Sequence, residues 1–424
     1  MATVQQLTKQ KHRKKHFKKQ KLKLFRANES VISVFMWGVN HTIKELSYIR
    51  CPLMLMPDDF KAYSKVKVDN HLYNKETLPS HFKVKEYCPM VFRRLRERFG
   101  IDDKEYANSL CLQQPVRVED AGRSRARFLQ SVDRKFVIKT LQSEDIAEMH
   151  TILPTYHQYA VEQGGQTLLP QYLGMYRLTL NNVEHYVLVT RNVMSNTLKT
   201  HKKYDLKGST VQREASEKEK TKEFPTFKDN DFVKDNVKIY MDQEARESFL
   251  TMLKRDVEFL ASLKLMDYSL LVGIHDRDRE DRYNDRIEVP EDADTYNNGQ
   301  DPDYSPGEDE NGLLATPPDS PGAPLRQDSQ EDDVGDVYRF NSAENSPKSV
   351  IYFMGLIDIL THYDAKKKAA HAVKTAKHGS GAEISTVKPF QYSKRFLEFI
   401  NEHMITPDSQ SNANAAQAAG ESSS

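Results

Sequence analysis

The sequence predicts an α+β fold, and three observations support that prediction. Two segments repeat apolar residues at the spacing of an amphipathic helix, and four short apolar runs rich in β-branched residues are typical of strands. Helices mixed with short strands in this way favour an α+β architecture. The third observation is a long acidic, proline-containing stretch that divides the apolar segments into two groups.

The first predicted helix begins near Asn28 and Ser30, which can cap its amide groups. Its apolar face consists of Val31, Phe35, Val39, Ile43 and Leu46. The second helix has Glu244 and Glu247 near its start, where negative charge suits the helix dipole. Its apolar face consists of Phe249, Leu253, Val257, Leu260 and Leu263. The predicted strands are residues 136–138, 186–189, 270–274 and 350–356.

The charge of the chain is unevenly distributed. Over 424 residues, 62 Lys and Arg nearly balance 61 Asp and Glu, which gives a net charge of +1. Residues 1–28 contain ten basic and no acidic residues, whereas residues 276–346 contain 21 acidic and 6 basic residues. We expect a disordered insert at 276–346, because its composition cannot bury enough apolar surface. The remainder has 56 basic and 40 acidic residues, which favours an anionic partner.

This composition defines the expected domain organisation. A basic segment spans residues 1–28, and a folded domain spans residues 29–405 with the insert at 276–346 inside it. The 59 residues after the insert are too few for an independent core, so the insert interrupts one domain. The tail, residues 406–424, is rich in Ser, Ala, Asn and Gln and is expected to be disordered.

Missing patterns argue against several classes of protein. The three cysteines are widely spaced and form no CxxC, which disfavours a disulfide framework or a cysteine zinc site. The absence of GxxxxGK[ST], HRD, DFG, HExxH and GxSxG disfavours a P-loop NTPase, an ordinary protein kinase, a zincin and an α/β-hydrolase. No apolar run approaches the roughly 18 residues that span a bilayer, and the basic start lacks a signal-peptide core. We expect an intracellular protein with peripheral membrane contact.

The segment before Lys139 has features of a phosphate-binding loop. Residues 121–128 read AGRSRARF and precede a turn and the apolar run 136–138, which ends at Lys139. Small residues between two strands let the backbone approach a phosphate, and a lysine after such a strand can place its ammonium there. On this segment alone, an ordinary basic hairpin with a surface lysine is the simpler interpretation.

Two aspartates stand beside apolar segments, where an unpaired carboxylate is costly. Asp267 lies between the second helix and an apolar strand, and it either orients a reacting hydroxyl group or caps a turn. Asp358 ends an apolar run, and it either holds Mg²⁺ beside ATP phosphates or pairs with a neighbouring lysine.

Two basic stretches are candidates for binding anions. Residues 202–210 combine basic residues with Gly-Ser-Thr, and Arg213 and Lys228 follow. A later stretch contains Lys366, Lys367, Lys368, Lys374 and Lys377 among Ala and Val, as in segments that meet anionic lipid. The alternative for both stretches is a solvated basic loop.

Taken together, the chain resembles the phosphatidylinositol phosphate kinases over residues 20–275 and 348–405. The resemblance rests on YDLKGST at 204–210, MDYSLL at 266–271 and IDIL at 357–360. The segments that resemble the type II branch, the phosphatidylinositol 5-phosphate 4-kinases, are FMWGVNH at 35–41, MLMPDDF at 54–60 and YDAKKK at 363–368.

The resemblance implies a two-lobed lipid kinase fold, distantly like protein kinases, with the acidic insert as a variable loop. It implies transfer of the γ-phosphate of ATP, with Mg²⁺, to the 4-hydroxyl of phosphatidylinositol 5-phosphate, which yields phosphatidylinositol 4,5-bisphosphate. By the same resemblance, Lys139 is the ATP-phosphate lysine, Asp267 the catalytic aspartate and Asp358 the metal aspartate.

The resemblance also assigns binding positions. The nucleotide-contacting positions are Thr190, Arg191, Asn192, Val193 and Lys203. Arg213 and Lys228 match the pair that holds the phosphate already present on the substrate. Residues 364–391 match the activation loop that selects the lipid, including Lys366, Lys367 and Lys368. Within that loop Ala370 stands where the 5-kinase branch carries Glu, which favours the 4-kinase branch.

Two residues depart from the family pattern. Arg125 replaces the second glycine of a loop that resembles GKSGARF, and its side chain either obstructs close approach of the backbone to a phosphate or meets that phosphate with its charge. Met194 stands where nucleotide-sensing members carry Phe, so GTP remains an alternative to ATP. Arg125 also motivates an alternative function, a low-activity phosphoinositide-binding scaffold that regulates type I phosphatidylinositol phosphate kinases.

The resemblance implies partners as well as an activity. It implies a homodimer, with a heterodimer with paralogues as an alternative, and residues 53–59 resemble the segment with which type II members contact type I kinases. We expect contact with an anionic membrane, and a location that is cytoplasmic and peripheral on intracellular or plasma membranes, with the nucleus as an alternative. Nucleic acid is disfavoured, because only Phe17 and Phe25 accompany the first basic cluster.

Overall fold

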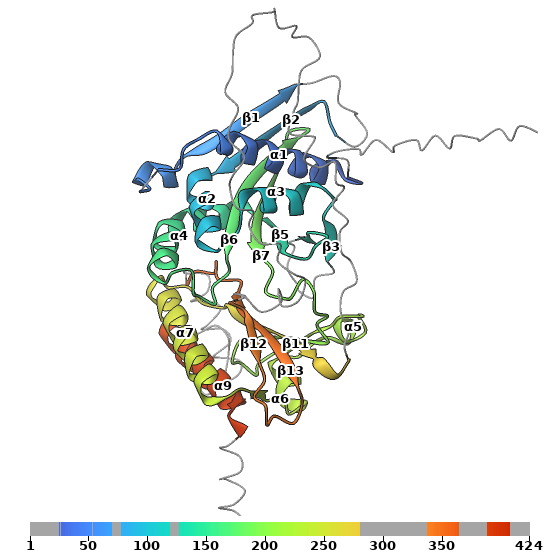
Figure 1. Cartoon of the computed structure of the whole chain (residues 1–424), viewed down its shortest axis with the longest axis vertical. Coiled ribbons are helices and arrows are strands. Elements are labelled where there is room, and N and C mark those ends of the chain that lie inside the picture. The colour runs from blue at the N-terminus through green and yellow to red at the C-terminus, as the bar shows by residue number, and fades with distance from the viewer. Residues whose placement is uncertain are drawn as a thin grey trace, which may run out of the picture.

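The computed structural model describes residue 25 and residues 27–52, 54–69, 78–118, 127–279, 337–363 and 388–407. These residues form two lobes, each built on its own sheet (Figure 1). We call residues 27–191 the N-lobe and residues 202–407 the C-lobe. The two lobes share one continuous apolar core.

The N-lobe is a seven-stranded antiparallel sheet with helices packed against it. Its strands are β1 (Tyr63–Asp69), β2 (His81–Tyr87), β3 (Val116–Val118), β4 (Phe128–Gln130), β5 (Phe136–Leu141), β6 (Tyr172–Leu180) and β7 (Val183–Arg191), in the spatial order β1-β2-β6-β7-β5-β4-β3. Its helices are α1 (Ser30–Ser47), η1 (Pro57–Phe60), α2 (Pro89–Arg98), α3 (Asp103–Cys111) and α4 (Ser143–Glu162). Helix α1 packs so close to β2 that a Cβ at Gly38 would lie only 2.8 Å from Val84 Cγ1.

The C-lobe contains a five-stranded sheet in the order β12-β13-β11-β8-β9 and a parallel pair, β10 with β14. Its strands are β8 (Lys202–Leu206), β9 (Thr226–Lys228), β10 (Ile239–Tyr240), β11 (Ser269–Asp276), β12 (Arg339–Asn341), β13 (Val350–Ile357) and β14 (Met404–Ile405). Its helices are α5 (Glu217–Lys220), α6 (Asp229–Lys234), α7 (Gln243–Ser262), η2 (Arg277–Arg279) and α9 (Pro389–His403). The long helix α7 packs along α9 (Figure 1).

The structure confirms the predicted α+β class, both predicted helices and all four predicted strands. The helices are α1 and α7, and the predicted strands lie within β5, β7, β11 and β13. The cap of α1 differs from the prediction. Glu29 is the N-cap residue of α1 and makes no side-chain cap bond, whereas Asp242 caps α7 by accepting from the Ala245 amide at 2.8 Å.

The predicted insert, residues 276–346, was too wide. Residues 276–279 and 337–346 are ordered, and only 280–336 lie outside the described residues. Tyr338 is fully buried and donates to the Leu169 carbonyl at 2.7 Å, and β12 pairs with β13. The average acidity of the stretch obscured the apolar residues at its end, which pack into the core. The segment 1–24 and residues 408–424 also lie outside the described residues.

Replacing Tyr338 with Ala is expected to lower the free energy of unfolding by about 3–5 kcal/mol, because it leaves a cavity beneath β13. Urea unfolding followed by circular dichroism measures this change. Glu344→Ala, at an exposed position of the same stretch, is the control and should unfold like the wild type. Equal stability of all three proteins would contradict the corrected boundary.

Candidate active site

Asp267 and Asp358 lie at the same end of the C-lobe sheet. Strands β11 and β13 are antiparallel with Ser269 opposite Ile357, so Asp267 precedes one strand where Asp358 follows the other. Both aspartates have left-handed backbone conformations, with φ of 65° and 58°. Such conformations cost free energy for residues other than glycine and persist where the surroundings impose them, often at functional sites.

Backbone contacts explain how these conformations are held. The Met266 amide donates to the Thr361 carbonyl at 2.9 Å, and the Tyr363 amide donates to the Lys264 carbonyl at 3.0 Å. A further isolated bridge joins Leu265 to His362. The segments that carry the two aspartates are therefore bonded to each other beyond the ends of their strands.

Lys139 connects the N-lobe to this pair of segments. It lies on β5, and its Nζ is 2.6 Å from Asp358 Oδ1. The alternative assigned to Asp358, pairing with a lysine, is thus observed, but the lysine comes from the other lobe. The side chains are 29% and 52% exposed, and an ion pair this accessible contributes only about 0–1 kcal/mol to stability. The contact leaves both groups accessible to a ligand between the lobes.

Lys207 is a site residue to which the sequence assigned no role. Its Nζ lies 3.1 Å from Asp267 Oδ1 and also donates to the Asp267 carbonyl. The two side chains are 16% and 23% exposed, so the pair is largely shielded from solvent. The YDLKGST segment contained the signal, but spacing alone could not reveal that β8 lies beside β11. Lys207 fixes the orientation of the Asp267 carboxylate.

Arg213 anchors the loop that follows β8. Its Nε lies 2.7 Å from Asp229 Oδ2, and its Nη2 lies 3.0 Å from Asp205 Oδ1. The other oxygen of Asp229 accepts from the backbone amides of Lys207 at 2.9 Å and Gly208 at 2.8 Å. One buried ionic cluster thereby holds the backbone from which Lys207 reaches Asp267.

The pKa values of these carboxyl groups reflect burial opposed by the guanidinium. Burial acts to raise the pKa of Asp205, but Arg213 and Lys207 outweigh it and hold the value below its usual range. For Asp229, burial is stronger than the attraction of Arg213, and its pKa is raised. The Nε and Nη2 atoms of Arg213 bond to carboxylates of the protein itself. The contact of Arg213 with a substrate phosphate stays a prediction.

Lys228 lies close to this cluster, as the predicted pairing with Arg213 requires. Strand β9 runs parallel to β8, and Lys228 is opposite Asp205. The Asn230 amide donates to the Arg213 carbonyl at 2.8 Å, which ties the start of α6 to the same place. The structure therefore brings the two predicted phosphate-binding residues to one end of the sheet.

The predicted nucleotide-contacting residues lie along the connection between the lobes. Thr190 and Arg191 end β7, Val193 is buried in the linker, and Lys203 lies on β8 opposite Gly273. The Arg191 Nη2 donates to the Phe99 carbonyl at 3.0 Å. Thr190 and Arg191 lie opposite Val137 and Phe136 of β5, the strand that also carries Lys139.

Asn192 and Met194 shape this linker. Asn192 donates through Nδ2 to the Arg134 carbonyl at 2.9 Å and accepts from the Met194 amide at 3.1 Å. A Cβ at Gly273 would lie 2.3 Å from Met194 Sδ, so the glycine makes room for this side chain on the C-lobe sheet. The remaining predicted residues, Arg125, Lys366, Lys367, Lys368 and Ala370, lie outside the described residues.

The carboxylate of Asp358 fits the needs of Mg²⁺. Within the described ranges, no group of three or more His, Cys, Asp and Glu could hold a metal ion. Mg²⁺ typically takes one or two carboxylates and completes its coordination with water and substrate phosphates. An accessible aspartate at the lobe boundary, beside a lysine suited to phosphate, therefore suffices on the protein side.

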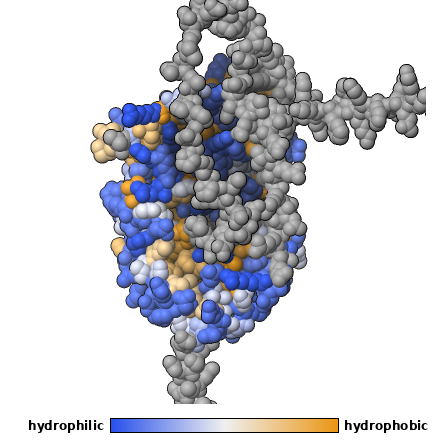
Figure 2. Space-filling model, in the orientation of Figure 1, coloured by the Kyte–Doolittle hydropathy of each residue, from blue (hydrophilic) through white to orange (hydrophobic). Residues whose placement is uncertain are grey.

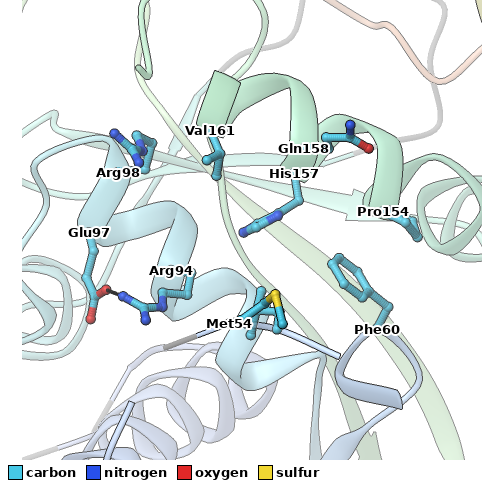
Figure 3. A pocket seen from close by; sticks show the side chains of 10 residues that line it. Met54, Phe60, Arg94, Glu97, Arg98, Pro154, His157, Gln158 and Val161 are labelled. Atoms are coloured by element: carbon cyan, nitrogen blue, oxygen red, sulfur yellow. Dashed lines mark hydrogen bonds and ion pairs between the residues drawn. The ribbon is translucent and has the colours of Figure 1, made fainter. Parts of the chain in front are cut away.

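A separate groove lies on the N-lobe, away from these residues (Figure 3). It has a volume of about 650 Å³ and lies between η1, α2 and α4. Met54, Phe60 and His157 point into its centre, and Arg94 pairs with Glu97 along α2 (Figure 3). Burial, Arg94 and Arg98 lower the pKa of His157, so its ring is neutral at pH 7. Leu53, the first residue of the predicted contact segment 53–59, lies outside the described residues.

Comparison with known proteins gives consistent matches over most of the chain. The family described as Phosphatidylinositol-4-phosphate 5-Kinase matches residues 109–403. The chain is 60% identical over 404 residues to human phosphatidylinositol 5-phosphate 4-kinase type-2 alpha, covering 94% of this chain and 97% of that protein. The chicken type-2 alpha protein is also 60% identical, over 93% of this chain and 96% of its own length. The human type-2 beta protein is 60% identical over 92% of this chain and 93% of its length.

Replacing Arg213 with Ala is expected to lower the free energy of unfolding by about 3–5 kcal/mol, because it leaves the buried Asp229 and the largely shielded Asp205 without their cation. Urea denaturation at pH 7 measures the loss. Lys234→Ala removes a 63% exposed lysine paired with Glu214 and is the control, with a change near zero. If Arg213→Ala unfolds like the wild type, the cluster does not anchor the loop.

Proposed function

The chain belongs to the phosphatidylinositol-4-phosphate 5-kinase family, and we propose that within it the chain acts as a phosphatidylinositol 5-phosphate 4-kinase. It is a lipid kinase that phosphorylates the 4-hydroxyl of phosphatidylinositol 5-phosphate, and its product is phosphatidylinositol 4,5-bisphosphate. The observation that carries this conclusion is the 60% identity, over more than nine tenths of the chain, to relatives named as 4-kinases.

The alternative, a low-activity scaffold, is less well supported. It rested on Arg125 in the glycine loop. Lys139 reaches Asp358 across the lobes, and Lys207 orients Asp267, and these two contacts support the proposal that the chain transfers a phosphoryl group. A protein retained only as a scaffold would not need the two strained aspartates.

We propose that ATP binds between the lobes with its phosphates beside Lys139. The ammonium of Lys139 would offset the negative charge of the transferring group, which is the main contribution a protein makes to phosphoryl transfer. Mg²⁺ held by Asp358 would supply further charge compensation when bound. Thr190, Arg191, Asn192, Val193 and Lys203 would line the nucleotide side, and GTP is the second donor to be tested against ATP.

Asp267 would act on the lipid hydroxyl. Its carboxylate would accept the proton of the 4-hydroxyl or orient that group toward the γ-phosphate, with Lys207 fixing the orientation. Arg213 and Lys228 would hold the existing 5-phosphate. The loop that contains Lys366, Lys367, Lys368 and Ala370 would select the lipid.

We propose that the β1–β2 face of the N-lobe contacts an anionic membrane. Lys65 is opposite Lys85, and Lys67 is opposite Lys83, so four lysines share one face of two paired strands. Directly opposed like charges destabilise a sheet, and an anionic surface would relieve that repulsion. Burial lowers the pKa of Lys85, and the nearby charges of Arg177 and Lys65 lower it further. The side of the molecule seen in Figure 2 is predominantly hydrophilic.

The remaining partners and the location are also proposals. No helix among the described residues is both long and apolar enough to cross a bilayer. We propose a cytoplasmic, peripheral protein on intracellular or plasma membranes, with the nucleus as an alternative, and a homodimer or a heterodimer with paralogues. The groove beside Met54, Leu55 and Phe60 supports contact with type I kinases, since it offers an apolar surface at the segment 53–59.

Asp267→Asn is expected to reduce phosphorylation of phosphatidylinositol 5-phosphate by about 10²–10⁴-fold, because an amide cannot accept the hydroxyl proton. Turnover of labelled ATP on vesicles containing the lipid measures this loss. Asp242→Asn is the control, because asparagine still caps α7 and this position lies at the other end of that helix from Asp267. Its turnover is expected to be near normal. Equal turnover of wild type and Asp267→Asn would remove Asp267 from the mechanism.

Replacing Lys65 and Lys67 with Ala is expected to weaken binding to phosphatidylserine-containing vesicles by about 1 kcal/mol per lysine. Vesicle sedimentation at low and high salt measures the difference, which should shrink as salt screens the charges. The charge-matched control is Lys254→Ala combined with Lys394→Ala, which removes two exposed lysines from α7 and α9 of the C-lobe. An equal loss of vesicle binding in the test variant and in the control would argue against the β1–β2 face as the membrane-binding face.

A further inference from the structure

Asp256 is a buried carboxylate that the mechanism above does not use. It lies on α7 of the C-lobe and has no exposed surface. Three donors from the N-lobe converge on it: Tyr159 Oη at 2.5 Å, Thr167 Oγ1 at 2.9 Å and the Leu168 amide at 2.6 Å. A buried carboxylate is costly unless it is hydrogen-bonded, and every one of these bonds crosses from one lobe to the other.

The peptide group held by Asp256 leads directly to the active site. The Leu168 amide donates to Asp256, and the Leu168 carbonyl accepts from the Leu356 amide at 2.7 Å. Leu356 lies near the end of β13, and Asp358 follows that strand. A continuous series of bonds therefore runs from Asp256 through one N-lobe residue to the strand that carries the metal aspartate.

Neighbouring contacts hold the same N-lobe loop from the C-lobe side. Arg255 donates to the Gln166 carbonyl, and Tyr338 donates to the Leu169 carbonyl at 2.7 Å. The ring of Tyr159 stacks on Phe259 of α7 with centroids 4.0 Å apart. The loop between α4 and β6 belongs to the N-lobe, as Lys139 does. These contacts fix the loop against α7 and β13 of the C-lobe.

The charge state of Asp256 is compatible with this role at neutral pH. Burial raises its pKa to about 6, although the bonds from Tyr159, Leu168 and Thr167 and the charge of Arg255 act to lower it. The carboxylate is therefore mostly ionised at pH 7 and accepts from all three donors. An amide at this position could accept through one atom only.

We propose that Asp256 is a positioning residue that sets the separation between Lys139 and Asp358 by fixing the loop between α4 and β6 against β13. Lys139 belongs to the N-lobe and Asp358 to the C-lobe, so their 2.6 Å contact depends on how the lobes are held together. The catalytic part of this inference rests on the proposed function, because the consequence is a misplaced nucleotide phosphate. Displacements of about 1 Å at a reacting centre can reduce a rate by about 10²-fold.

The test compares Asp256→Asn with Asp242→Ala in the full-length protein. Asp242 caps the same helix without reaching the N-lobe, and its loss lowers stability through α7 alone. Hydrogen exchange of peptides containing Leu168 and Leu356 reports the coupling independently of activity. Exchange in both peptides is expected to accelerate about tenfold in Asp256→Asn and to be unchanged in Asp242→Ala.

Steady-state kinetics with ATP and phosphatidylinositol 5-phosphate then report the consequence. Asp256→Asn is expected to raise KM for ATP and lower kcat by about tenfold each, with KM for the lipid unchanged. Tyr159→Phe, which removes one donor and keeps the carboxylate, should give a smaller change in the same direction and serves if Asp256→Asn does not fold.

Some outcomes would overturn the proposal. If exchange near Leu356 is unchanged in Asp256→Asn, or if Asp242→Ala shows the same kinetic change at equal stability, Asp256 has a merely structural role. Absence of turnover in the wild type would instead refute the proposed function, while the exchange experiment would still decide the coupling between Asp256 and β13.

Discussion

The candidate active site depends on the antiparallel pairing of β11 with β13. This register brings Asp267 and Asp358, which are far apart in sequence, to the same end of one sheet. Backbone hydrogen bonds between the adjoining segments hold both aspartates in left-handed conformations. The pairing of two buried strands offsets the free-energy cost of these conformations. Lys139 and Lys207 then reach these carboxylates from opposite sides, one from each lobe.

Two kinds of electrostatic contact surround this centre, and they differ in purpose. The Arg213 cluster is buried and bonded to backbone amides, so it fixes the shape of a loop. The Lys139–Asp358 pair is accessible and contributes little to stability, so its value lies in what it can bind. In the proposed mechanism the cluster gives rigid support to Asp267, and the accessible pair lies where we propose that phosphates and a metal ion bind.

The sequence predicted two of the helices and four of the strands, because apolar periodicity and runs of β-branched residues are local signatures. Periodicity revealed α1, α7 and the central strands, and resemblance supplied roles for Lys139, Asp267 and Asp358. The ordered end of the insert was missed, since average acidity outweighed Tyr338 in the composition. The roles of Lys207 and Asp256 could not be predicted, because they depend on which strand lies beside β8 and on contacts between lobes.

The central claim is that the chain phosphorylates the 4-hydroxyl of a lipid that already carries a 5-phosphate. The most direct test is to determine the position of the new phosphate after reaction of labelled ATP with phosphatidylinositol 5-phosphate and, separately, with phosphatidylinositol 4-phosphate. We expect label at the 4-position from the first lipid and little product from the second. Preferential labelling at the 5-position of phosphatidylinositol 4-phosphate would contradict it.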